Sequence, residues 1–133
     1  TLKDFTHACR DFYDALSHNY PDAKIFALTP IWRGDMDEIK SMGAFDVLKN
    51  TIIDQTDDLG NVHVIDCTNA VPSESKYFAS DLLHPNDDGF DYYARFVYQK
   101  IKEILELYMS MPETLADFSL RDTAETLLRI LEE

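Results

Sequence analysis

Apolar residues recur along the chain with two different periods, which predicts an alternation of helices and strands. A first stripe has the three- and four-residue spacing of one buried helix face, and this helix is expected to end near His18 and Asn19. The stripe comprises Leu2, Phe5, Cys9, Phe12 and Leu16. The segment Lys24–Thr29 is short, almost wholly apolar and followed by Pro30. Such a run is typical of a strand that is buried on both faces.

The same alternation continues through the second half of the chain. Residues 31–40 are predicted to form a loop, and helical spacing resumes from Phe45 to Thr56. After a turn, Val62–Asp66 has the β-branched character of a second strand. A long loop then leads to Asn86, a suitable N-cap for an amphipathic helix that we expect to end at Met109–Pro112. Its expected apolar face comprises Phe90, Tyr93, Ala94, Val97, Ile101, Ile104, Leu105 and Tyr108.

The order helix, strand, helix, strand, helix predicts an α/β fold with a parallel sheet. Two strands make a small sheet, whereas parallel sheets of this kind have several strands and helices on both faces. We therefore expect residues 1–109 to be part of a doubly wound domain and residues 110–133 to be a helical tail. In such folds functional groups collect beyond the carboxyl ends of the strands, where the loop between Asp66 and His84 would lie.

Charge narrows the range of partners. Among 133 residues, 12 are basic and 25 are acidic, which gives a net charge of −13. This surface repels phosphate backbones and anionic membrane surfaces, so nucleic acid is not an expected partner. No apolar run approaches the roughly 20 residues of a membrane span. The hydrophobic fraction of 45% is ordinary for a globular protein.

Metal sites and disulfides are not indicated by the residue spacing. Cys9 and Cys67 are isolated and form no CxxC motif, so we expect two buried or half-buried free thiols. The acidic segment 35–38 lacks the glycine and the spaced ligands of a calcium-binding loop, and it is expected to be a solvated turn. His7, His18 and His63 are expected at the surface or at helix ends.

The segment Asp81–Asn86, which reads Asp-Leu-Leu-His-Pro-Asn, carries the clearest chemistry. A carboxylate three residues before an imidazole can hold one ring nitrogen, so that the other nitrogen acts as a general base. Pro85 biases His84 toward an extended conformation, which would fix the backbone from which the ring projects. The alternative is an Asp–His hydrogen bond that only closes a surface loop, and the spacing alone favours this alternative.

The pattern Asp81-x-x-His84-Pro85-Asn86-x-x-Gly89 resembles the C-terminal catalytic block of the SGNH/GDSL hydrolases, which are esterases and lipases. The segments 20–31 and 62–66 also resemble the family's later strands. The resemblance implies a flavodoxin-like three-layer α/β/α sandwich. It also implies a Ser–His–Asp mechanism with His84 as general base, Asp81 as the orienting carboxylate and a small-molecule ester as substrate. Triad chemistry of this kind requires no metal or organic cofactor.

The family's nucleophile lies in a Gly-Asp-Ser motif after the first strand, and its oxyanion hole adds a Gly and an Asn from two further blocks. No serine of this chain lies in such a motif, and Gly34-Asp35-Met36 has Met where the serine would be. We therefore expect the nucleophile upstream of Thr1, in a missing N-terminal half of the domain on the same or another chain. The isolated chain would then be inactive.

Two questions stay open at the level of sequence. Trp32 and Arg33 follow the first predicted strand, where they could hold the acyl or sugar part of an ester, or where Trp32 could simply cover the sheet edge. The chain as a whole could also be a non-catalytic acidic α/β module for binding or assembly, in which the turn containing Asp81 and His84 is a relic.

Overall fold

The alternation of helices and strands is confirmed by a computed structural model, which describes residues 1–110 and 118–132. The expected end of the long helix at Met111 and Pro112 lies outside the described residues. The elements in chain order are α1 (Leu2–Asn19), β1 (Ile25–Leu28), α2 (Phe45–Thr56), β2 (Val62–Ile65), the short 3-10 helix η1 (Ser75–Tyr77), α3 (Asp87–Met109) and α4 (Phe118–Glu132).

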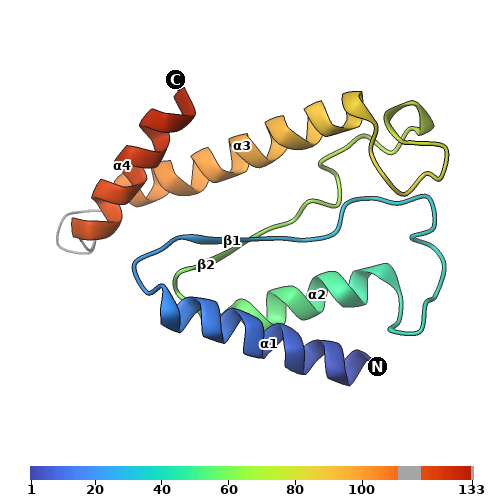
Figure 1. The fold of residues 1–133 in the computed structure, drawn as a ribbon, viewed down its shortest axis with the longest axis horizontal. Helices are drawn as coiled ribbons and strands as arrows, with labels where there is room; N and C mark the ends of the chain where they lie inside the picture. The colour runs from blue at the N-terminus through green and yellow to red at the C-terminus, as the bar shows by residue number, and fades with distance from the viewer. Residues whose placement is uncertain (111–117, 133) are drawn as a thin grey trace.

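Strands β1 and β2 form a parallel pair in which Ile25 lies opposite Val62 and Leu28 lies opposite Ile65. Helix α2 connects them, as a parallel crossover requires. Figure 1 shows α1 and α2 on one side of the strands and α3 with α4 on the other. The expected α/β class is therefore confirmed, with a sheet of two strands within the described residues.

One core lies between the sheet and helices α1 and α2. Ala27, Leu59 and Val62 are buried there, and Tyr13 packs against them. Phe12, which the sequence placed on the buried stripe of α1, is instead 58% exposed. Tyr13 faces the sheet because it lies four residues, about one helical turn, after the buried Cys9.

The second core lies between the sheet and α3, with α4 packed on the same helix. Leu105 is fully buried against Leu128, and Phe26 of β1 packs beside them. Phe90 was expected on the apolar face of α3 but is 55% exposed. A further set of half-buried residues contacts buried Ile65, Cys67 and Ala70; in α3 it comprises Tyr93, Phe96, Val97, Ile101 and Ile104.

Both cysteines and one histidine lie within these layers. Cys9 and Cys67 are buried free thiols, which confirms the sequence prediction. His63, expected at the surface, is half-buried on β2 with its ring centroid 5.8 Å from that of Phe26. Burial, and secondarily the charge of Lys24, lowers the pKa of His63.

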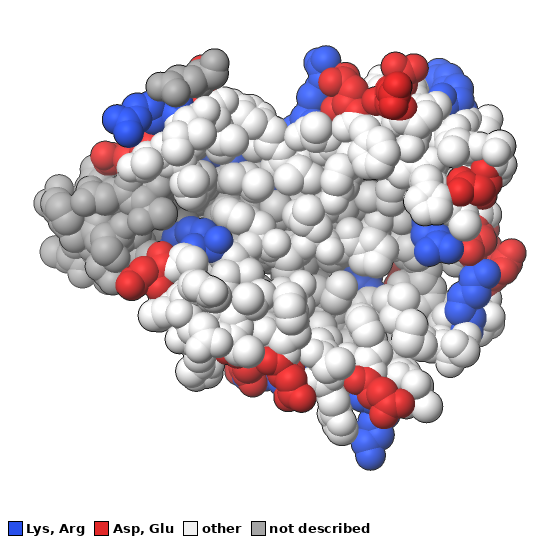
Figure 2. Space-filling view, viewed as in Figure 1, with Lys and Arg blue, Asp and Glu red and all other residues white. Residues whose placement is uncertain are grey.

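Strand β1 has one open edge. The backbone N–H of Ile25 donates to the carbonyl of Asn61, and that of Thr29 donates to the carbonyl of Ile65. Because backbone groups alternate along a parallel strand, those of Phe26 and of the partly exposed Leu28 point away from β2. Figure 2, viewed as Figure 1 with β1 toward the reader, shows charged side chains around the rim of this face and an uncharged centre. In a chain of charge −13, this distribution marks the open β1 edge as a distinct surface.

None of the helices in the described part of the chain combines the length and the apolar character needed to cross a membrane.

The second core provides a direct test of the fold. Leu105→Ala should lower the free energy of unfolding by about 2–5 kcal/mol, because it leaves a cavity between α3, α4 and β1. Leu107 lies on the same helix and is 62% exposed, so Leu107→Ala should change this free energy by at most about 0.5 kcal/mol. Urea denaturation measures both variants, and equal losses would contradict the assignment of Leu105 to the core.

Candidate active site

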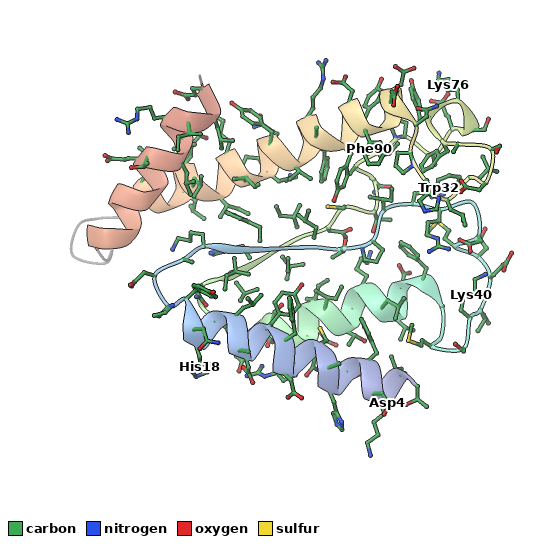
Figure 3. The ribbon with its side chains drawn as sticks, in the orientation of Figure 1. Asp4, His18, Trp32, Lys40, Lys76 and Phe90 are labelled. Carbon is green, nitrogen blue, oxygen red and sulfur yellow. The ribbon has the colours of Figure 1, made fainter. Side chains whose placement is uncertain are left out.

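The Asp81–His84 loop follows β2 and precedes α3, at the end of the molecule toward which both strands run. Figure 3 shows Trp32, Lys40 and Lys76 at this end and His18 at the opposite end. Loops beyond the carboxyl ends of parallel strands are where α/β folds place their functional groups. The loop therefore has the position that the strand order predicts.

The carboxylate of Asp81 and the imidazole of His84 are in direct contact. Nδ1 of His84 lies 2.6 Å from Oδ2 of Asp81. The other oxygen, Oδ1, accepts the backbone N–H of Leu83 at 2.9 Å and that of His84 at 3.2 Å. The hydrogen bond from the His84 ring, followed by those two backbone N–H groups, lowers the pKa of Asp81 from 3.8 to about 2.

The low pKa of Asp81 determines which nitrogen of His84 carries the proton. Above about pH 4 the carboxylate is ionised and can only accept, so the neutral ring must donate through Nδ1–H. Nε2 is then an acceptor with a free lone pair, as a general base requires. Because the folded-state pKa is depressed, the contribution of Asp81 to stability is present above pH 3.8 and is lost as the pH falls through about 2.

Asn86 anchors the loop. Its side-chain Nδ2 donates to the carbonyl of Lys76 at 2.7 Å, and its backbone N–H donates to the carbonyl of Tyr77 at 3.0 Å. Its Oδ1 accepts the N–H of Gly89 at 3.0 Å, which confirms Asn86 as the N-cap of α3. The carbonyl of His84 also accepts a backbone N–H from Ala79 at 2.8 Å. The backbone of His84 is thus fixed to the segment around η1.

Leu82, between the two members of the pair, has a backbone conformation that is rare for a bulky side chain, with φ at +56°. Its carbonyl accepts the backbone N–H of Gly34 at 2.8 Å. A Cβ atom at position 34 would lie only 2.7 Å from Cβ of Leu82. The loop after β1 therefore presses on Leu82, and only glycine at position 34 allows this approach.

Trp32 and Arg33 have different roles in the structure. The ring of Trp32 packs edge-to-face against buried Phe78, with 5.0 Å between ring centroids. This contact ties the loop after β1 to the segment that leads into the Asp81–His84 turn. Arg33 donates from Nε and Nη2 to the two oxygens of Asp35, each at 2.9 Å, and it lines a cavity beside the loop.

The described residues supply no nucleophile to this pair. The side chain of His84 is 77% exposed, and no serine, threonine or cysteine side chain in residues 1–107, 109–110 or 125–132 hydrogen-bonds to its Nε2. Ser80, which directly precedes Asp81, is exposed and makes no such contact. Within the same ranges, no three His, Cys, Asp or Glu side chains converge in a way that could hold a metal ion.

Comparison with protein-family models, with curated proteins and with solved structures gives no match. Interpretation of the site therefore depends on the geometry of Asp81 and His84 and on the motif that contains them.

Asp81→Asn should reverse the tautomer of His84. The two backbone N–H groups that now bind Oδ1 would hold the amide oxygen and turn the amide nitrogen toward Nδ1, which must then accept. Nitrogen-15 spectra of the ring at about pH 9, where imidazoles are neutral, distinguish the two tautomers. We expect Nδ1–H in the wild type and Nε2–H in the variant, and identical spectra would contradict the described hydrogen bond.

Gly89→Ala should destabilise the protein and displace the loop. A Cβ at position 89 would lie 2.2 Å from the carbonyl oxygen of Tyr77 and 2.9 Å from Cβ of Pro85. This overlap should outweigh the roughly 1 kcal/mol by which alanine is favoured over glycine in a helix. Gly60→Ala is the matched control, because a Cβ there meets nothing within 4 Å. Thermal unfolding measures both, and a more stable Gly89→Ala variant would refute this packing.

Proposed function

We propose that this chain is the C-terminal part of a serine ester hydrolase of the SGNH/GDSL type, with a flavodoxin-like three-layer sandwich as its complete domain. The observation that carries the proposal is the 2.6 Å contact between Nδ1 of His84 and Oδ2 of Asp81, which leaves Nε2 exposed at the carboxyl end of a parallel sheet. The Asp-x-x-His-Pro-Asn motif that builds this geometry supports the same conclusion.

In this mechanism Nε2 of His84 removes the proton from a serine hydroxyl while the serine oxygen attacks the ester carbonyl carbon. Nε2 then gives that proton to the departing alkoxide, which leaves as the alcohol. Water, activated by the same nitrogen, hydrolyses the acyl-serine and regenerates the serine. Asp81 stabilises the imidazolium that forms in each step and keeps the ring in the Nδ1–H tautomer.

The serine and the oxyanion-hole donors are supplied, in this proposal, by a segment outside the 133 residues. Two observations favour this arrangement. Nε2 of His84 is exposed where a nucleophile would have to lie, and β1 presents an open edge in the centre of an uncharged face. A further parallel strand on that edge would enlarge the sheet and cover the uncharged surface around it. The substrate is a small-molecule ester.

A second candidate is a non-catalytic acidic α/β module that serves binding or assembly. It is favoured by the lack of any hydroxyl or thiol partner for Nε2 of His84 in the described part of the chain. The amino-acid sequence encoded upstream of Thr1 distinguishes the two candidates. A Gly-Asp-Ser motif after a strand pattern supports the hydrolase, and a reading frame without one supports the module.

The hydrolase proposal is tested on the product of the complete reading frame. A fluorophosphonate should label one serine outside the 133 residues, and His84→Ala should lower kcat for a short-chain aryl ester by at least about 100-fold. Asp81→Ala should have a smaller effect, since Asp81 orients the base and does not itself transfer the proton. His18→Ala, at the opposite end of the molecule, is the control and should leave kcat unchanged.

Two results would refute this assignment. Near-normal turnover by His84→Ala would remove His84 from the mechanism. Stoichiometric labelling of a serine in the isolated 133-residue chain would show that the nucleophile lies within it.

A further inference from the structure

A cavity of about 220 Å³ lies between the loop after β1 and the first turns of α2. Its apolar wall consists of half-buried residues from both elements, namely Pro30, Met36, Met42, Phe45 and Leu48. The loop places two methionines on this wall. Methionine adapts its shape to a ligand at little cost, because its side chain is unbranched and polarizable.

The cavity shares a boundary with the site of Asp81 and His84. Arg33 lines the cavity, and the next residue, Gly34, donates its backbone N–H to the carbonyl of Leu82 at 2.8 Å. Leu82 directly follows Asp81 in the loop that carries His84. A group held in the cavity is therefore separated from the loop by the short segment around Gly34.

The charged residues at the cavity neutralise one another. Asp35 accepts two hydrogen bonds from Arg33 and lies 3.1 Å from Nζ of Lys40. Lys40 also pairs with Glu38. Two cations thus face two anions. The hydrogen bonds from Arg33, with a smaller effect of Lys40, lower the pKa of Asp35. The cavity offers an incoming ligand no unpaired charge, so a charged group would lose its hydration there without compensation.

We propose that this cavity binds a small uncharged apolar group, such as a butyl chain or a phenyl ring. An apolar cavity of about 150 Å³ accommodates benzene, whereas sites for drug-sized ligands occupy about 300–1,000 Å³. The volume of about 220 Å³ lies between these values and favours a short acyl chain over a long one. The identity of this group rests on the proposed function. The group is the apolar part of the ester, and the enzyme prefers short-chain or aryl esters.

The test uses binding, which needs neither His84 nor a nucleophile. The 133-residue chain, carbon-13-labelled at its methionine methyl groups, is titrated with N-butylacetamide, an uncharged ester mimic. The signals of Met36 and Met42 should shift and saturate, while that of Met109 at the end of α3 should not move. N-octylacetamide and n-butylammonium should bind at least about tenfold more weakly, because one is too long and the other is charged.

Two substitutions in the same loop form a matched pair. Met42→Trp fills the cavity and should weaken binding of N-butylacetamide at least about tenfold. Ile39 is 83% exposed and does not line the cavity, so Ile39→Trp should bind as the wild type does. If circular dichroism shows that Met42→Trp does not fold, Leu48→Phe takes its place in the comparison, because it fills the same space from α2.

Absence of a saturable shift in the wild type, or equal affinity in the cavity-filling and control variants, would overturn the proposal. Binding that is lost in the product of the complete reading frame would also overturn it, because another segment would then occupy the cavity. If N-butylacetamide does not bind but turnover still depends on His84, the cavity proposal alone is rejected. Binding without any turnover rejects the hydrolase and leaves the cavity as a binding site.

Discussion

The carboxylate of Asp81 receives three N–H groups, and this convergence organises the whole loop. Oδ2 binds the ring of His84, while Oδ1 binds the backbone N–H groups of Leu83 and His84. Both the ring and the backbone of His84 are therefore oriented by one side chain. The same hydrogen bonds keep Asp81 ionised down to about pH 2, so the proton of the neutral ring is held on Nδ1 and Nε2 is left as the acceptor.

This arrangement requires a backbone conformation that is unfavourable by about 1–2 kcal/mol at Leu82, where φ is positive. Contacts from three parts of the chain offset it. Gly34 binds the carbonyl of Leu82 from the loop after β1, Asn86 joins the loop to the segment around η1, and Gly89 allows α3 to approach that segment closely. Strained residues of this kind cluster at active sites and ligand-binding sites. Here the contact at Gly34 also joins the loop to the neighbouring cavity.

The sequence predicted the elements well because apolar periodicity and turn residues are local signals. The strands around Ile25–Leu28 and Val62–Ile65 and the N-cap at Asn86 follow from such signals. The exposure of Phe12 and Phe90 could not be predicted from such signals. Tertiary packing decides which of several neighbouring apolar residues on a helix turns toward the core.

At the site, the pairing of Asp81 with His84 was predictable from a three-residue offset in one motif. The approach of Gly34 to Leu82 and the cavity beside Met36 and Met42 join segments far apart in sequence, and periodicity carries no information about such contacts. The most direct measurement is the crystal structure of the product of the complete reading frame. The account predicts a serine Oγ within about 2.6–3.2 Å of Nε2 of His84. A His84 whose Nε2 still faces solvent there would contradict it.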